Sequence, residues 1–316
     1  MSSLSRMRLV FIATGDIALP SFRRLLADGP RPLALVTQPD KPAGRHQTPK
    51  PPRIRLEAQA AGIPVLQPLR SSDCANDLRA LAPEVIVVMA YGQILRDDLL
   101  ALPSLAIINL HASLLPRHRG AACIQSALDA GDRESGITSM HVTRELDAGD
   151  VILARAIPIA SDETGGSLHD RLADLAADVL MDTLRCLAAG DAPRVPQDPV
   201  LATHVPKLTR DHGRIDWSMS ATAIERRIRA YDPWPGTHAR MVADGRSMRL
   251  KIFPPARVIA RDAAGALPPG ESLVRDGRWF VGCGDGRIEL LRVQPEGARR
   301  MEAAEFLRGH TPGRME

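Results

Sequence analysis

The chain has 316 residues, which is too long for one compact core, so we expect two domains. Hydrophobic residues (44%) and charged residues (25%) are present in ordinary proportions for a globular protein, and no apolar run is long enough to indicate a transmembrane helix. The polar N-terminus does not resemble a signal peptide, and the four cysteines have neither pairing nor metal-site spacing. We therefore expect a cytoplasmic protein with reduced thiols, no membrane association and no metal.

The net charge of +4 is unevenly distributed along the chain. Residues 1–190 carry 20 Lys and Arg against 21 Asp and Glu, whereas residues 191–316 carry 21 against 16. A neutral half followed by a basic half is typical of a catalytic domain joined to a domain that binds a polyanion. A general bias toward arginine is the alternative, because the chain has only four lysines.

The first half alternates short apolar runs with helical patterns. The apolar runs lie at residues 8–13, 33–36, 85–89 and 106–108. Helices are expected between Pro20 and Gly29 and at residues 53–61, 121–130 and 167–189. Continuous apolar strands separated by helices indicate an α/β fold, with a Rossmann-like, mainly parallel sheet covered by helices on both faces.

The pattern changes after the helix that ends near residue 189. Residues 192–206 contain four prolines and predict an extended linker. Short β segments broken by Gly and Pro follow, at residues 248–252, 257–259, 272–274, 279–281 and 288–293. Such spacing predicts a small, mainly β domain built as a barrel or sandwich.

A group of polar residues follows the apolar run at 106–108. Asn109 and His111 come at the carboxyl end of that strand, where open parallel sheets bind ligands, and strand alternation places both side chains on one side. Asp147 follows further along the chain. Acyl transfer to an amine uses these groups. Asn109 can donate to the oxyanion of the tetrahedral adduct, and His111 can stabilise it as an imidazolium or relay a proton. Asp147 can raise the pKa of His111 or take the amine's proton.

Two motifs around these residues resemble the 10-formyltetrahydrofolate-dependent formyltransferase family. They read Asn-Leu-His-Ala-Ser-Leu-Leu-Pro-Arg at 109–117, continuing as Arg-Gly-Ala-Ala at 119–122, and Leu-Asp-Ala-Gly-Asp at 146–150. The resemblance implies that Asn109, His111 and Asp147 are catalytic and that 10-formyltetrahydrofolate is the co-substrate. It also implies that the folate contacts Ser113, Leu114, Leu115 and Pro116 and, in a pteridine pocket, Met89, Tyr91, Gly92 and Leu95.

Other motifs favour the branch of this family that formylates the α-amine of initiator methionyl-tRNA for translation initiation. Residues 37–45 are similar to that branch's inserted tRNA-binding loop, and residues 206–209 and 213–217 to the join with its C-terminal domain. The resemblance implies tRNA contacts from Lys41, Arg45, Lys50 and Lys207. It divides the chain into a catalytic domain (1–190), a linker (191–207) and an OB-like tRNA-binding domain (208–316), in a protein that we expect to be monomeric.

The alternative acceptor is an amino sugar nucleotide, because sugar formyltransferases share the Trp-Pro-Gly turn at 234–236. The chain also departs from the family pattern. His118 stands where tryptophan is common and Cys123 where proline is common, the first turn lacks the family's Gly-Thr-Pro, and the front loop is shorter. We expect Cys123 to pack within its helix.

Two other classes of function fit the sequence less well. A dinucleotide enzyme would need G-x-G-x-x-G after the first strand, and Thr14-Gly15-Asp16 lacks that spacing. The glycine-rich residues 282–286 lie among β segments, where a hairpin turn is expected. A pure RNA-binding module would leave Asn109, His111 and Asp147 without a purpose.

Overall fold

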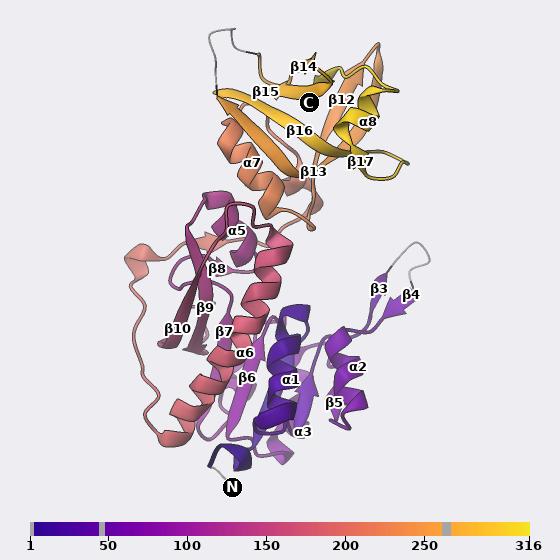
Figure 1. Ribbon diagram of the computed structural model, residues 1–316. Coiled ribbons are helices and arrows are strands. Elements are labelled where there is room, and N and C mark those ends of the chain that lie inside the picture. Colours follow the sequence, from indigo (N-terminus) through magenta and orange to yellow (C-terminus); the bar gives the residue numbers. More distant parts are fainter. Residues whose placement is uncertain (1–2, 44–47, 261–266) are drawn as a thin grey trace. The chain divides into compact units, whose positions relative to one another are not determined.

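The computed structural model describes residues 3–43, 48–260 and 267–316 (Figure 1). The chain forms two compact units, which are described separately. The N-terminal unit comprises Met1–Cys123, Glu134–Ile157 and His169–Val205, and the C-terminal unit comprises Ile124–Arg133, Pro158–Leu168 and Pro206–Glu316. None of the helices in the described ranges is long and apolar enough to cross a membrane.

A seven-stranded sheet forms the centre of the N-terminal unit, in the order β10-β9-β7-β6-β1-β2-β5. Its strands are β1 (Leu9–Ala13), β2 (Ala34–Val36), β5 (Val65–Leu66), β6 (Val85–Met89), β7 (Ala106–His111), β9 (Glu134–His141) and β10 (Val151–Pro158). The neighbouring pairs β5–β2, β2–β1, β1–β6 and β6–β7 are parallel, whereas β7 and β9 are antiparallel. The predicted, mainly parallel sheet is thus confirmed.

Helices cover both faces of this sheet, as predicted. The helices in this part of the chain are η1 (Ser3–Arg6), η2 (Asp16–Ala18), α1 (Leu19–Asp28), α2 (Arg53–Ala60), η3 (Ser71–Cys74), α3 (Ala75–Ala80), α4 (Asp97–Leu100), α5 (Cys123–Ala130), α6 (Gly165–Ala189) and η4 (Pro199–Leu201). Residues 124–130 of α5 and 165–168 of α6 belong to the C-terminal unit. Alternation along β1 separates the two faces. Ile12 belongs to one buried cluster with Leu78 of α3 and Leu99 of α4, whereas Phe11 meets Phe22 of α1 with ring centroids 5.9 Å apart.

Two strands of the sheet, β9 and β10, carry no clear signal in the sequence. In β9 nearly every residue is buried, yet Ser135, Thr138, Ser139 and His141 are polar, so the strand lacks the apolar run of its neighbours. Hydrogen bonding satisfies part of this polarity, since the hydroxyl oxygens of Ser139 and Thr183 of α6 lie 2.8 Å apart. Polar but buried strands of this kind escape pattern reading, because burial here depends on partners distant in the chain.

Two small β pairs lie outside the main sheet of the N-terminal unit. The front loop forms a hairpin of β3 (Lys41–Ala43) and β4 (Thr48–Lys50). Within the proline-rich segment after α6, Val195 bridges to Val151, and β11 (His204–Val205) pairs in parallel with β8 (Arg119–Gly120). The end of this extended segment therefore lies beside the loop that follows β7.

The C-terminal unit is built on an antiparallel sheet in the order β14-β15-β16-β13-β12-β18, with β17 paired to β16. The strands are β12 (Thr237–Ala243), β13 (Arg246–Ala260), β14 (Ser272–Arg275), β15 (Arg278–Gly282), β16 (Gly286–Pro295), β17 (Met301–Glu302) and β18 (Arg314–Met315). Its helices are η5 (Arg210–Gly213), α7 (Ala221–Ala230) and α8 (Ala303–Leu307). This half-barrel confirms the predicted small β domain, and the hairpin turn expected at residues 282–286 joins β15 to β16.

One strand differs from its prediction. Residues 248–252 and 257–259 belong to a single strand, β13, whose pairing with β16 shifts register between Phe253 and Ala256. Pro254 and Pro255 lie at this shift. Proline has no N–H to donate to the ladder, so the irregularity falls where the sequence shows a break.

Aromatic residues occupy the core of the C-terminal unit. Trp279 and Phe306 are fully buried and stack with centroids 5.2 Å apart and an interplanar angle of 8°. Ile224 and Ile228 of α7 belong to the same cluster. This one core therefore joins the sheet to both α7 and α8.

We predict that Phe306→Ala lowers the free energy of unfolding by about 3–5 kcal/mol, because it removes a buried ring and leaves a cavity against Trp279. Denaturant unfolding followed by tryptophan fluorescence measures the loss. Val274→Ala on β14 is the control. Val274 is 46% exposed, so its truncation should change the free energy by no more than about 0.5 kcal/mol. Equal losses in the two variants would contradict the assigned core.

Candidate active site

Asn109 and His111 lie on β7 itself rather than beyond its end. The sequence indicates a strand that stops at residue 108, but β7 continues to His111 because the antiparallel strand β9 extends the ladder. Asn109 pairs with Val88 of β6 on one side and Met140 of β9 on the other, and His111 pairs with Thr138. Both side chains are thus held by a strand inside the sheet rather than by a loop.

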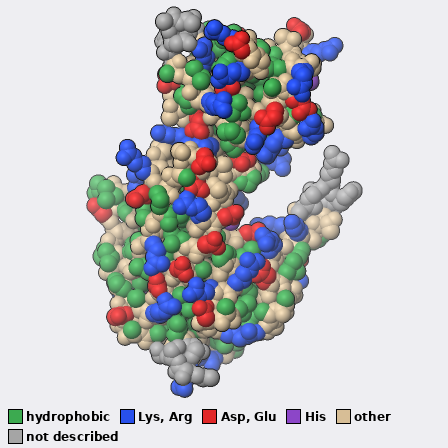
Figure 2. Space-filling view, viewed as in Figure 1, with side chains coloured by type: hydrophobic (Ala, Val, Ile, Leu, Met, Phe, Trp, Pro, Cys, Tyr) green, Lys and Arg blue, Asp and Glu red, His purple; other side chains and the backbone are tan. Residues whose placement is uncertain are grey.

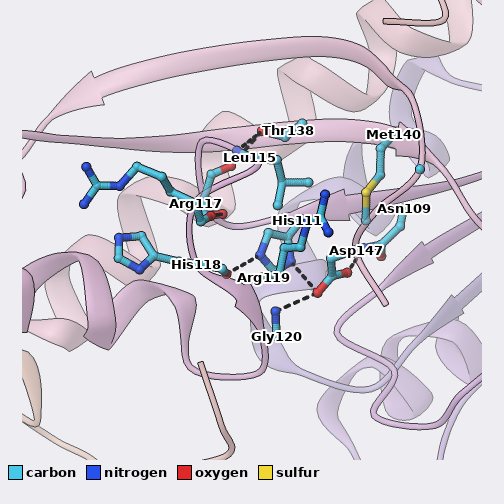
Figure 3. A network of polar contacts seen from close by, with 12 residues as sticks. Asn109, His111, Leu115, Arg117, His118, Arg119, Gly120, Thr138, Met140 and Asp147 are labelled. Atoms are coloured by element: carbon cyan, nitrogen blue, oxygen red, sulfur yellow. Dashed lines mark hydrogen bonds and ion pairs between the residues drawn. The ribbon is translucent and has the colours of Figure 1, made fainter. Parts of the chain in front are cut away.

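His111 is buried and held through both ring nitrogens (Figure 3). Its Nε2 lies 3.0 Å from the carbonyl oxygen of His118, and its Nδ1 lies 3.6 Å from Oδ2 of Asp147. Since a carbonyl oxygen can only accept a hydrogen bond, Nε2 carries a hydrogen. A hydrogen on Nδ1 as well would point toward the carboxylate, so the surroundings favour the doubly protonated ring.

The pKa of His111 depends on two opposing effects, the burial of the ring and its polar contacts. Burial lowers the pKa, but contacts with Cys123, the Asp147 carboxylate and the His118 carbonyl outweigh burial and raise it to about 9. His111 is therefore an imidazolium at neutral pH. Cys123, at the start of α5, is buried as expected, and it also lies against the imidazole ring.

Asp147 is held by partners from two other segments (Figure 3). Its side chain is 9% exposed, and Oδ2 accepts a hydrogen bond from the backbone N–H of Gly120 at 2.8 Å. Oδ1 lies 3.5 Å from Nδ2 of Asn109. The backbone of Asp147 is left-handed, with φ of +52°, which costs on the order of 1 kcal/mol in a residue other than glycine. The surrounding contacts must therefore maintain this turn.

The loop after β7 is braced from within and by β9. Ser113 Oγ donates to the carbonyl of Arg117 at 2.7 Å. Thr138 Oγ1 donates to the carbonyl of Ser113 at 2.7 Å and accepts from the N–H of Leu115 at 3.2 Å. Leu114 packs on Gly136, where an added Cβ would lie 2.5 Å from Leu114 Cδ2. Among the predicted folate contacts, Ser113 and Leu114 thus also determine the shape of the loop.

The segment after α6 braces the same loop from another direction. The N–H of His118 donates to Thr203 Oγ1 at 2.8 Å, and the N–H of Arg119 donates to the carbonyl of Thr203 at 2.8 Å. Gly120 has a φ of +111°, and a Cβ there would lie 2.3 Å from the carbonyl oxygen of Val205. Only glycine permits this approach, which leaves the Gly120 N–H directed at Asp147.

The turn after β6 lies at the same sheet edge, because β6 and β7 are parallel neighbours. Met89, Tyr91 and Leu95 are buried. The carbonyl of Tyr91 accepts hydrogen bonds from Thr14 Oγ1 at 3.2 Å and from Gln38 Nε2 at 2.6 Å. Gly92 has a φ of +83°, and a Cβ there would lie 2.6 Å from Gln38 Nε2. The predicted pteridine-binding turn is thus held by hydrogen bonds from Thr14 and Gln38 at the sheet edge that also carries Asn109 and His111.

The predicted tRNA contacts fall in both units. Lys41 and Lys50 are exposed and stand directly opposite each other in the β3–β4 hairpin. Two like charges in opposed positions repel each other, so an anion bound between them would stabilise the hairpin. Lys207 is exposed in the C-terminal unit, and Arg45 lies outside the described residues.

The structure adds residues that sequence reasoning did not single out. Thr138 positions the loop after β7, and Thr203 holds the backbone of His118 and Arg119. A buried polar residue in a sheet, such as Thr138, becomes recognisable only once burial is known. Thr203 carries no local signal, since its partners are far away in the sequence.

Two family models match successive parts of the chain. Residues 7–184 match the family model described as formyl transferase, and residues 207–311 match the model described as formyl transferase, C-terminal domain. The chain is 48% identical to a methionyl-tRNA formyltransferase of Akkermansia muciniphila, over 96% of this chain and 97% of that protein. It is 43% identical to a methionyl-tRNA formyltransferase of Moorella thermoacetica, over 98% and 99% of the two chains.

Solved structures share the fold at much lower identity. An N-formyltransferase from Helicobacter canadensis, in complex with folinic acid and dTDP-3-aminofucose, has a TM-score of 0.67 at 14% identity and covers 93% of this chain and all of its own. HypX from Aquifex aeolicus, in complex with tetrahydrofolic acid, has a TM-score of 0.60 at 19% identity and covers 96% of this chain and 47% of its own. At these identities the likeness concerns the fold alone.

We predict that His111 titrates near pH 9, well above the ordinary value of about 6.5 for histidine, because contacts with Cys123, the Asp147 carboxylate and the His118 carbonyl outweigh the effect of burial. NMR of imidazole-labelled protein measures the midpoint. His141 is the internal control, since burial and Arg194 lower its pKa. A titration midpoint for His111 below 6.5, lowered as that of His141 is, would contradict an imidazolium at neutral pH.

Proposed function

The chain belongs to the formyl transferase family, and we propose that it transfers the formyl group of 10-formyltetrahydrofolate to the α-amine of initiator methionyl-tRNA. The observation that carries the proposal is the cluster of Asn109, His111 and Asp147 around the buried His111 ring, in a chain closely related along its whole length to methionyl-tRNA formyltransferases. The amino sugar nucleotide is not favoured as acceptor, because the structural neighbour with a sugar ligand is only 14% identical.

The transfer joins the amine nitrogen to the formyl carbon and breaks the bond between that carbon and N10 of the folate. Attack by the neutral amine moves the carbonyl π electrons onto oxygen and gives a tetrahedral oxyanion. Collapse re-forms the carbonyl and expels N10 with the bonding pair, and the proton released by the amine ends on N10. The protein must therefore stabilise an oxyanion and accept a proton in transit.

We assign stabilisation of the oxyanion to Asn109 and His111, and acceptance of the proton from the amine to Asp147. With a pKa of about 9, His111 stays charged at neutral pH and serves as a fixed positive charge rather than as a base. Asn109 contributes a neutral N–H donor from the same strand. The carboxylate of Asp147 is the remaining base in the cluster. An α-amine titrates near pH 8, so a small local effect suffices to free it for attack.

We place the folate along the carboxyl edge of β6 and β7. Residues 113–116 and the turn formed by Met89, Tyr91, Gly92 and Leu95 would contact it there. Both segments are braced by hydrogen bonds before any ligand arrives, which reduces the ordering that binding requires. The reduced pteridine would lie against the turn, with the formyl group on N10 directed toward His111.

We place the tRNA on the β3–β4 hairpin and on the basic second half, with 1–190 as the catalytic domain and 208–316 as the tRNA-binding domain. Lys41, Arg45, Lys50 and Lys207 would contact phosphates. Figure 2 shows many Lys and Arg side chains on the visible face of the C-terminal unit, with Asp and Glu side chains between them. A hollow of about 430 Å³ in that unit has Arg210, Arg249 and Lys251 in its lining, beside the half-exposed ring of Trp234. Cations beside an exposed aromatic ring suit a phosphate with an unstacked base.

We predict that the protein formylates charged initiator tRNA in the presence of 10-formyltetrahydrofolate, and that His111→Ala lowers kcat by about 10²–10⁴-fold. Acid-gel separation of formylated from unformylated aminoacyl-tRNA measures the product, and an amino sugar nucleotide is offered in parallel. Asn76→Ala, an exposed change on α3, is the control and should retain parental turnover. Product on the sugar alone would overturn the acceptor, and a kcat of His111→Ala within threefold of the parent would overturn the role of His111.

We predict that Lys41→Ala and Lys50→Ala each raise the KM for tRNA, and that each reduces the slope of log affinity against log salt by about 1, as loss of one phosphate contact does. Lys251→Ala tests the hollow of the C-terminal unit in the same way. Arg24→Ala is the control, because Arg24 is already paired with Asp28 and Asp178. Salt slopes that match the parent in all three lysine variants would refute the proposed RNA contacts.

A further inference from the structure

Gln197 lies in the extended, mostly exposed segment after α6, yet its side-chain amide is fully engaged. Nε2 donates to the carbonyl of Asp147 at 2.9 Å and to the carbonyl of Gly149 at 2.8 Å. Oε1 accepts from Nε and one terminal nitrogen of Arg119, at 3.1 and 2.9 Å. Both amide hydrogens and both oxygen lone pairs therefore have partners.

The partners determine the orientation of the amide. Carbonyl oxygens only accept hydrogen bonds and a guanidinium only donates them, so the nitrogen must face Asp147 and Gly149 while the oxygen faces Arg119. A carboxylate cannot replace this amide, because it would place an acceptor against two acceptors. The site therefore requires a glutamine rather than a glutamate.

The two loops joined by this amide hold the His111–Asp147 pair from opposite sides. On one side is the left-handed turn at Asp147, where Gly149 approaches His141 so closely that a Cβ would lie 1.8 Å from the His141 carbonyl oxygen. On the other side is the loop that contains the buried Arg119. The residues before and after it in the sequence, His118 and Gly120, both contact the pair. The carbonyl of His118 accepts from His111, and the N–H of Gly120 donates to Asp147.

We propose that Gln197 is a positioning residue for formyl transfer, which locks the turn at Asp147 to the backbone at 118–120 and so aims the carboxylate at the His111 ring. The proposal rests on the proposed function for its reaction, but its geometry is independent of the formyl acceptor. Gln197 touches neither His111 nor any reacting atom in this arrangement. It acts through the orientation of Asp147.

Two variants separate the two halves of the amide. Gln197→Glu keeps an acceptor for Arg119 but loses both donors to the turn at Asp147. Gln197→Leu has a similar volume but loses the acceptor as well as the two donors. We expect each to lower kcat by about 10–100-fold, as small misplacements of a catalytic group do, with KM for tRNA and folate within about twofold of the parent. Asp198→Ala is the matched control, since Asp198 only caps the next turn through the N–H of Val200 and should retain parental kcat.

The NMR titration of His111 distinguishes positioning from general loosening of the fold. Burial lowers the pKa of His111, and the groups facing the ring that raise it are Cys123, the Asp147 carboxylate and the His118 carbonyl. If Gln197 aims the carboxylate, both Gln197 variants should titrate at a lower pH than the parent, while Asp198→Ala should match it. An unchanged midpoint, or a kcat within threefold of the parent in folded Gln197→Glu, would overturn the proposal.

The two proposals can fail separately. If the parent protein forms no formylmethionyl-tRNA, the proposed function fails. The His111 midpoints of the Gln197 variants still report whether the amide positions Asp147. A fall in kcat that follows a fall in melting temperature, and disappears when the assay is cooled, would assign Gln197 to stability alone and overturn its positioning role.

Discussion

The buried pair of His111 and Asp147 is the interaction on which the site depends. Their side chains are 7% and 9% exposed, and a charge buried to this degree costs several kcal/mol unless a partner and hydrogen bonds compensate. Each therefore requires the other, together with the carbonyl of His118 and the N–H of Gly120. Those two backbone groups can face the pair only if the loop turns sharply, with positive φ at both residues. The electrostatic requirement thus determines the conformation of the loop.

The sheet supplies the rigidity that this pair needs. β7 has a parallel neighbour on one side and an antiparallel neighbour on the other, so Asn109 and His111 are held in ladders on both edges. The antiparallel strand β9 also brings Thr138 opposite His111, and its hydroxyl holds the loop after β7 through Ser113 and Leu115. A polar, buried strand is unfavourable by itself, but here its hydroxyl groups replace water as partners for the loop backbone.

Charge explains the proposed division of roles at the site. The residues alone allow His111 to act either as an imidazolium or as a proton relay. Burial lowers the pKa of the ring, but contacts with Cys123, the Asp147 carboxylate and the His118 carbonyl outweigh burial and raise it to about 9. In the proposed mechanism Asp147 is therefore the base, and Asn109 and His111 face the negative charge that develops on oxygen.

The sequence by itself determined the fold class, the family and the identity of the candidate residues. The strands β1, β2, β6 and β7 are recognisable because they are buried on both faces and hence nearly all apolar, and the motifs at 109–122 and 146–150 are local. Only the tertiary structure decided the protonation of His111, the strands β9 and β10, and the contribution of the segment after α6. Those features depend on residues far apart in the chain. Thr203 meets His118 across 85 residues and Gln197 meets Asp147 across 50, and no local pattern encodes a contact at that separation.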